Sequence, residues 1–139
     1  MSSPLISIVM IAYNEERRVR GCIDSLTAQT CREIEILCVD DGSTDGTAAV
    51  MDDAAHDDPR VRVIRQGTNR GMAAGRHAGF KAAAGQYILF VDADDALVPQ
   101  TCERLLAEMR EQPADVLDFG LFLVPDSQSP PTQEALEGL

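Results

Sequence analysis

Three carboxylates stand close together behind one apolar run of the sequence. Asp92, Asp94 and Asp95 follow Tyr87–Val91 within the stretch FVDADD. Aspartates are common in turns, but a turn accounts for the capping role of one of them rather than of all three. Three like charges at the mouth of a buried strand repel one another unless a cation lies among them. Carboxylates on either side of one residue suit a hard divalent cation, Mg²⁺ or Mn²⁺, with coordination positions left open for a ligand.

The segments that must position these acids alternate between two hydrophobic periods. Short β-branched runs bounded by polar turns predict strands, three of them buried on both faces as in a parallel sheet. Apolar residues at helical spacing predict helices between the strands, the last with Pro99 in its first turn. The predicted strands are Leu5–Ala12, Ile34–Val39, Val61–Ile64 and Tyr87–Val91, and the predicted helices are Val19–Leu26, Ala48–Ala55, Gly71–Ala84 and Cys102–Met109.

This alternation predicts one α/β domain with a mostly parallel sheet and right-handed crossovers. A fifth strand is predicted at Val116–Val124. From Pro125 onward the sequence loses its periodicity and gains proline and serine, so a disordered tail is predicted there. The predicted domain is therefore residues 1–124, and the predicted tail is residues 125–139.

Polar stretches follow each of the first four predicted strands. In an open α/β sheet, ligands bind in the crevice beyond the carboxyl ends of the strands, so these stretches are expected to converge. An anionic diphosphate fits the site, held by a bridging metal, a helix N-terminus and Arg70 or Arg76, while Asp40, Asp41 and Glu15 accept hydrogen bonds from a base or ribose. The stretches are YNEE (13–16), DDGSTDGT (40–47), QGTNRG (66–71) and DADD (92–95).

Two other interpretations of DDGSTDGT remain open. It suits a turn and helix cap, with Ser43 or Thr44 as N-cap and Asp45 in the first turn. It also matches a calcium-binding loop, whose positions one, three, five, six and twelve fall on Asp41, Ser43, Asp45, Gly46 and Asp52. That loop requires a helix ahead of it, whereas IEILCV is a β-forming run, so the calcium loop is disfavoured.

Composition narrows the partners and the compartment. The 139 residues include 12 Lys and Arg against 23 Asp and Glu, a formal net charge of −11, which disfavours nucleic acid. Arg17, Arg18 and Arg20 are predicted to form a solvated helix face. No membrane-spanning run or signal peptide is recognisable, which predicts a cytoplasmic chain, or the cytoplasmic part of a longer protein at the membrane face. The cysteines are predicted to be reduced, with Cys22, Cys38 and Cys102 in the core.

Five motifs in order resemble the nucleotide-sugar-binding half of family-two glycosyltransferases. They are SIVMIAYNEE, LCVDDGSTDGT, NRGMAAGRHAG, GQYILFVDADD and the helix after it, covering about Ser7 to Met109. The resemblance implies the GT-A fold, a three-layer sandwich around a mostly parallel sheet. It also implies inverting transfer from a nucleotide-diphosphate sugar, most often a UDP-sugar, with Mn²⁺ or Mg²⁺ as cofactor. The expected setting is cell-wall or polysaccharide biosynthesis, with a glycan, lipid or protein as acceptor.

Residue roles follow from the same resemblance. Asp92 and Asp94 match the family's Asp-x-Asp motif, with Asp94 as metal ligand and Asp92 contacting ribose or metal. Asp41 matches the residue that recognises the base, and Arg76 the arginine near the diphosphate. Tyr13 is expected to pack against the base, while Ala12 and Glu15 line the nucleotide pocket.

The resemblance assigns no catalytic residue within the chain. In the family the general base and the acceptor surface come from a later segment, so the base is expected beyond Leu139. The chain is then predicted to be truncated before the acceptor half and to bind without transferring. An exposed sheet edge left by truncation would favour self-association.

Two other classes of protein compete with this interpretation. A non-catalytic nucleotide-binding module acting in a complex is the main alternative. A nucleotidyltransferase is disfavoured, because YNEERR has no glycine after the first strand.

Overall fold

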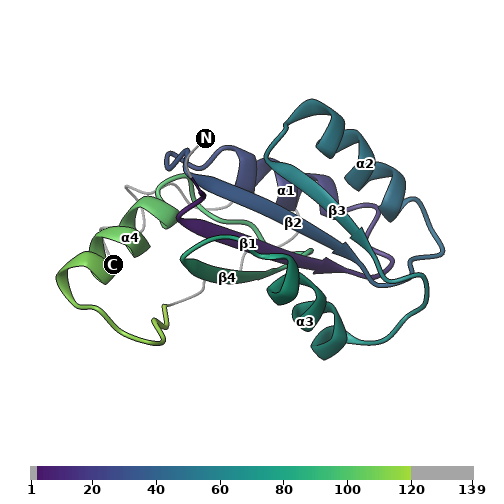
Figure 1. The fold of residues 1–139 in the computed structure, drawn as a ribbon. Coiled ribbons are helices and arrows are strands. Elements are labelled where there is room, and N and C mark those ends of the chain that lie inside the picture. The colour runs from purple at the N-terminus through teal and green to yellow at the C-terminus, as the bar shows by residue number, and fades with distance from the viewer. Residues whose placement is uncertain (1–2, 120–139) are drawn as a thin grey trace.

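Strands and helices alternate through the part of the chain that the structure, a computed structural model, describes: residues 3–119 (Figure 1). Each observed strand begins and ends within one residue of its predicted bounds. All four predicted helices are also present. The elements are β1 (Ile6–Ala12), α1 (Val19–Thr27), β2 (Ile34–Asp40), α2 (Thr47–Asp57), β3 (Val61–Arg65), α3 (Met72–Ala82), β4 (Tyr87–Asp92) and α4 (Thr101–Glu111).

The strands form one parallel sheet in the order β3-β2-β1-β4. The chain therefore moves outward from β1 to β2 and β3, and then crosses back to place β4 on the other side of β1. Such a reversal of strand order opens a crevice between the two loops that leave the sheet in opposite directions. In this chain those loops follow β1 and β4, which are the loops that carry YNEE and DADD.

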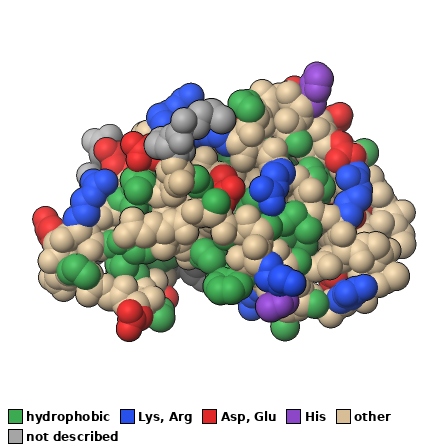
Figure 2. All heavy atoms as spheres, in the orientation of Figure 1, with side chains coloured by type: hydrophobic (Ala, Val, Ile, Leu, Met, Phe, Trp, Pro, Cys, Tyr) green, Lys and Arg blue, Asp and Glu red, His purple; other side chains and the backbone are tan. Residues whose placement is uncertain are grey.

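Both faces of β1 are buried, because it lies between β2 and β4 with helices on either side. Ile8 and Met10 belong to the larger core cluster, which includes residues of α1, α2 and α4, whereas Val9 and Ile11 face α3. The expectation of three fully buried strands is wrong for β4. Phe90 is 44% exposed, since β4 forms an edge of the sheet within the described residues. Figure 2 shows hydrophobic side chains gathered along β4 and α4 on this face.

Glycines let α3 pack directly on β1. A Cβ added at Gly75 would lie 2.8 Å from Cγ2 of Ile11, and one added at Gly79 would lie closer still to Cγ1 of Val9. Close packing of helix on strand therefore explains glycines that lower the intrinsic helix propensity of this segment.

The last described segment departs from prediction in two places. The final helix begins at Thr101, so Pro99 precedes it instead of lying in its first turn. Residues 116–119 form no strand, and the rest of the predicted fifth strand lies outside the described residues, as do the predicted boundary at 124 and the tail.

The cysteines agree with the sequence-based expectation. All four cysteines are free thiols, and Cys22, Cys38 and Cys102 are buried in the core. Burial raises the pKa of Cys38 and of Cys102 to about 12. Within residues 3–119, every helix is too short or too polar to cross a membrane.

Candidate functional site

A tight turn at the end of β4 gathers the three aspartates, here called the acidic triad (Asp92, Asp94 and Asp95). The backbone N–H of Asp95 donates to the carbonyl of Asp92 at 3.0 Å, which closes the turn. Ala93 between them is buried, 3% exposed, whereas the side chains of Asp92 and Asp94 are about half exposed. Burying Ala93 therefore turns its two neighbours toward solvent, and one carboxylate oxygen from each triad member lies within 4.8 Å of the others.

The triad fits a divalent cation. Opposite oxygens around an octahedral ion are separated by about 4.2 Å, twice the metal–oxygen distance of about 2.1 Å. Three oxygens include at most one opposite pair, and adjacent oxygens are about 3.0 Å apart, so triad oxygens up to 4.8 Å apart need to approach by up to about 2 Å. A change of rotamer in these exposed side chains covers that shift. Their chemistry, carboxylate oxygen only, also matches the preference of Mg²⁺ and Mn²⁺. In residues 3–119 it is the one group of three or more His, Cys, Asp or Glu residues whose potential ligand atoms lie this close to one another.

Two arginines from different elements flank the triad. Nη1 of Arg18, at the start of α1, lies 3.9 Å from Oδ2 of Asp94, and Nη2 of Arg76, on α3, lies 3.9 Å from Oδ1 of Asp92. The guanidinium of Arg76 also lies over the ring of Phe90, 5.8 Å from its centroid. Partial burial, together with the charges of Asp94 and Asp92, raises the pKa of Asp95. The site thus combines concentrated negative charge with cations on two sides.

The end of β2 is fixed against both β1 and the loop before α3. The N–H of Asp41 donates to the carbonyl of Ala12 at 2.9 Å, which continues the parallel pairing past the strands. The carboxylate of Asp41, 3% exposed, accepts the backbone N–H groups of Arg70 at 2.8 Å and Gly71 at 2.9 Å. Asp41 therefore holds the loop that leads into α3 and toward Arg76.

Side chains also join the loops after β1 and β2. Asn14, with a positive φ of 52°, donates its N–H to Oγ of Ser43 and accepts the N–H of Thr44 at 2.8 Å. Glu16 accepts the N–H of Gly46 at 3.0 Å. These bonds hold the backbone around Tyr13, whose ring is 45% exposed, beside the end of β2.

The calcium-loop interpretation of DDGSTDGT is wrong, because its ligands point to different partners. Asp41 binds the loop before α3, and Asp52 pairs with Arg65 on β3. Asp45 accepts the N–H and hydroxyl of Thr47, which lowers its pKa.

The predicted N-cap is also wrong. α2 begins at Thr47 with Gly46 as N-cap, so Ser43 and Thr44 lie ahead of the helix. Asp45 lies ahead of it too, instead of within its first turn.

Comparison with known proteins agrees with this geometry. The model of the family described as glycosyl transferase family 2 matches residues 7–134. The chain belongs to this family. Among its curated relatives are the uncharacterized glycosyltransferase EpsJ of Bacillus subtilis, 41% identical over 119 residues, and glycosyltransferase GlyG of Streptococcus pneumoniae, 38% identical over 115 residues. These matches cover 86% and 83% of the chain but only 34% and 38% of the two relatives. The chain therefore spans about a third of the length of these relatives.

Solved structures of similar fold are GT-A glycosyltransferases. S. aureus TarS 1–349 in complex with UDP-GlcNAc matches with a TM-score of 0.72 and 30% identity, covering 76% of this chain and 31% of that one. The mannosyltransferase PcManGT of Pyrobaculum calidifontis, in complex with GDP-Man and Mn²⁺, matches with a TM-score of 0.67 and 27% identity, covering 83% and 34%. The α/β fold predicted from the sequence is thus confirmed as GT-A.

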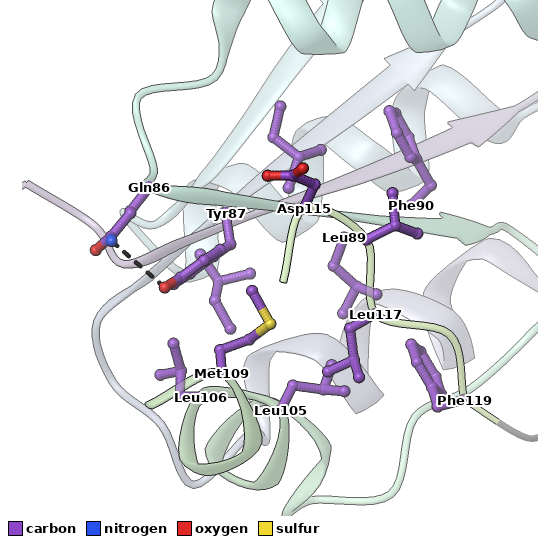
Figure 3. A pocket seen from close by; sticks show the side chains of 13 residues that line it. Gln86, Tyr87, Leu89, Phe90, Leu105, Leu106, Met109, Asp115, Leu117 and Phe119 are labelled. Carbon is purple, nitrogen blue, oxygen red and sulfur yellow. Dashed lines mark hydrogen bonds between the residues drawn. The ribbon is translucent and has the colours of Figure 1, made fainter. Parts of the chain in front are cut away.

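An apolar cavity of this family-2 chain lies along β4, and one of its lining residues, Phe90, also contacts Arg76 of the polar site. Its volume is about 580 Å³, and its lining comes mainly from β4, from α4 and from Asp115, Val116, Leu117 and Phe119 (Figure 3). Tyr87, Leu89 and Met109 point into it, and Asp115 is its one carboxylate lining residue. The cavity lacks converging polar groups, so the candidate site is the crevice beyond the strand ends.

The structure brings the predicted site residues together at the carboxyl ends of the strands and adds two residues, Asn14 and Arg18. Ala12 is buried beside Asp40 and Asp41, Tyr13 and Glu15 follow it, and the register places Asp92 beside Ile11. Sequence reasoning missed Asn14 as a link between loops and placed Arg18 on a solvated helix face. The one sequence signal for Arg18 is its position at the start of a predicted helix, just after the polar stretch that follows the first strand. That this stretch lies beside the triad depends on the strand order.

The structure does not test the predicted position of the general base. It is expected beyond Leu139, and residues 120–139 already lie outside the part of the chain that the structure describes. The absence of a catalytic base from the chain therefore stays a prediction.

Proposed function

We propose that this chain binds a nucleotide-diphosphate sugar, most simply a UDP-sugar, for inverting glycosyl transfer to an acceptor hydroxyl. The observation that carries the proposal is the acidic triad at the strand-order reversal, flanked by arginines and level with the end of β1. Its support is the shared family, together with the UDP-GlcNAc held by TarS and the GDP-Man and Mn²⁺ held by PcManGT.

In this proposal the nucleoside lies over the ends of β1 and β2. The half-exposed ring of Tyr13 offers a face on which a base can stack. A carboxylate has about four lone-pair positions, so Asp41 can accept a hydrogen bond from the base while it retains its two backbone donors. Ala12 and Glu15 complete the wall of this pocket.

The diphosphate lies between the triad and Arg76. Asp94 and Asp92 would hold a divalent cation, which supplies positive charge that stabilises the diphosphate leaving group. The guanidinium of Arg76 lies 3.9 Å from Asp92 and over the ring of Phe90, close enough for its planar fork of donors to turn to phosphate oxygens beside the triad. We assign the general base and acceptor site to segments beyond Leu139, in keeping with relatives more than twice as long as this chain.

Calorimetry tests the proposal. Wild-type protein is titrated with UDP in the presence of Mn²⁺, in its absence, and in parallel with GDP. We expect binding that depends on Mn²⁺, and a loss of about tenfold or more in affinity for Asp94→Ala, because a site with one fewer carboxylate holds the cation weakly. Asp53→Ala, an exposed aspartate of α2, is the matched control and should bind like the wild type.

The results of these titrations, together with a transfer assay, separate the proposed site, the choice of nucleotide and the position of the base. Equal binding by Asp94→Ala, or no Mn²⁺-dependent binding of either nucleotide by the wild type, would count against the proposed site. Preference for GDP would keep the site and replace the uridine nucleotide. Transfer of sugar by the 139 residues alone would overturn the assignment of the base to a segment beyond Leu139, whereas binding without transfer also accommodates a nucleotide-binding module acting in a complex.

A further inference from the structure

Arg18 reaches the acidic triad from the side opposite Arg76. Its backbone is fixed, because the carbonyl of Glu15 accepts the N–H groups of both Arg18 and Val19. Val19 is fully buried and begins α1, so the residue before it is held at the crevice. From there the guanidinium lies 3.9 Å from Asp94, the residue matched to the metal ligand of the proposed site.

The pairing between Arg18 and Asp94 is suited to exchange. Both side chains are about half exposed, and 3.9 Å is longer than a charge-assisted hydrogen bond. Water therefore screens the pair, and neither group is locked to the other. By contrast, Arg60 lies 2.8 Å from Asp58 with both side chains about 20% exposed, as expected of a structural pair.

Charge balance gives the Arg18 guanidinium an anion to face both with and without bound ligands. Without a bound cation, the mutual repulsion of three carboxylates is relieved by the arginines on each side. A divalent cation on Asp94 would offset the attraction between Asp94 and the Arg18 guanidinium and would repel that guanidinium. A diphosphate brought to the same place offers new oxygens, for which the planar fork of arginine is well shaped.

We propose that Arg18 exchanges partners within the site, pairing with Asp94 in the empty state and with the diphosphate of the nucleotide in the loaded state. The inference rests on the proposed function. In this arrangement Arg18 opposes binding of the cation alone and favours binding of cation and nucleotide together. It therefore couples the two ligands, so that each strengthens the binding of the other.

The test measures two affinities in the same variants. Electron paramagnetic resonance of free Mn²⁺ gives the affinity for the metal alone, and calorimetry at saturating Mn²⁺ gives the affinity for UDP. For Arg18→Gln we expect Mn²⁺ alone to bind roughly threefold tighter and UDP to bind roughly tenfold weaker. Arg18→Lys keeps the charge and loses the fork, so its Mn²⁺ affinity should stay near wild type while its UDP affinity falls.

Arg17→Gln is the matched control, since it removes the same charge from the neighbouring exposed position. It should change both affinities less than about twofold, the size of a screened long-range effect. Changes of equal sign in both affinities for Arg18→Gln, or an unchanged UDP affinity, would overturn the exchange. If wild-type protein binds UDP with Mn²⁺ while Arg18→Gln behaves as the wild type does, only this inference fails. If the wild type binds no UDP, the proposed function fails with it.

Discussion

At the scale of single residues, one buried carboxylate serves both the fold and the proposed site. Asp41 is 3% exposed, and each of its oxygens accepts a backbone N–H from the loop before α3. A buried charge is tolerated when hydrogen bonds replace its hydration, and here two backbone donors do so. The same bonds fix the loop that leads to Arg76, so Asp41 would position the diphosphate side of the pocket as well as contact the base.

Replacing Asp41 by asparagine tests this structural role. The amide keeps one acceptor oxygen but turns its NH₂ group toward the second backbone N–H, leaving donors face to face. We expect the free energy of unfolding of Asp41→Asn to fall by about 1–3 kcal/mol, measured by urea denaturation. Asp53→Asn on the exposed face of α2 should change it by less than about 0.5 kcal/mol. Equal stability of Asp41→Asn and wild type would show that the two bonds contribute little.

At the scale of elements, the contact between α3 and β1 depends on the absence of side chains. Gly79 leaves no room for a Cβ beside Val9, whereas a Cβ at Gly21 in α1 would meet nothing within 4 Å. The same substitution at these two helical positions should therefore have opposite effects.

Thermal and urea unfolding of Gly79→Ala and Gly21→Ala measure this difference. Alanine at Gly21 should stabilise the protein by about 0.5–1 kcal/mol, because it reduces the backbone entropy of the unfolded chain. At Gly79 the clash outweighs that gain, and we expect a net loss of about 1–3 kcal/mol. A stabilising Gly79→Ala would mean that α3 shifts away from the sheet at little cost.

The elements themselves were largely predictable, because their signals are local. Apolar runs such as Ile34–Val39 and the helical spacing from Cys102 to Met109 are read within a single segment. The burial of β4 was not predictable in this way, since exposure of Phe90 depends on which strand ends the sheet. The cap of α2 was misplaced because Ser43 and Thr44 are used by Asn14 in another loop.

The site was predictable to the same extent and for the same reason. The triad lies within four consecutive residues, and a turn is enough to bring its members together. Arg18 and Asn14 act across loops that are distant in sequence, so their roles depend on the order of β4, β1 and β2 in the sheet. Local patterns give strand–helix alternation but leave this order open.

At the scale of the whole molecule, a partly buried ion pair stabilises the fold against the repulsion among its excess negative charges. The chain carries a formal net charge of −11, which favours unfolding through self-repulsion near neutral pH. The pair of Asp58 and Arg60 lies between the end of α2 and the start of β3. Arg60 also donates to the carbonyl of Thr27, at the end of α1, at 2.9 Å, so the pair joins three elements. Hydrogen bonds from Arg60 lower the pKa of Asp58.

The lowered pKa of Asp58 predicts how stability responds to acid. An aspartate whose pKa is lower in the folded state stabilises the protein above its unfolded pKa of about 3.9, and that stabilisation is lost as the pH falls through the folded pKa. Urea denaturation from pH 7 to pH 3 should therefore show Asp58→Asn less stable than wild type by about 1–2 kcal/mol at pH 7, with the gap constant down to about pH 5 and shrinking below pH 4. Comparing the two proteins at each pH removes the relief of self-repulsion, which both share. Asp24→Asn breaks the exposed pair with Arg20 instead and should differ from wild type by no more than about 0.5 kcal/mol throughout. A gap for Asp58→Asn that persists unchanged at pH 3 would show that the side chain acts through its shape and neutral hydrogen bonds rather than through its charge.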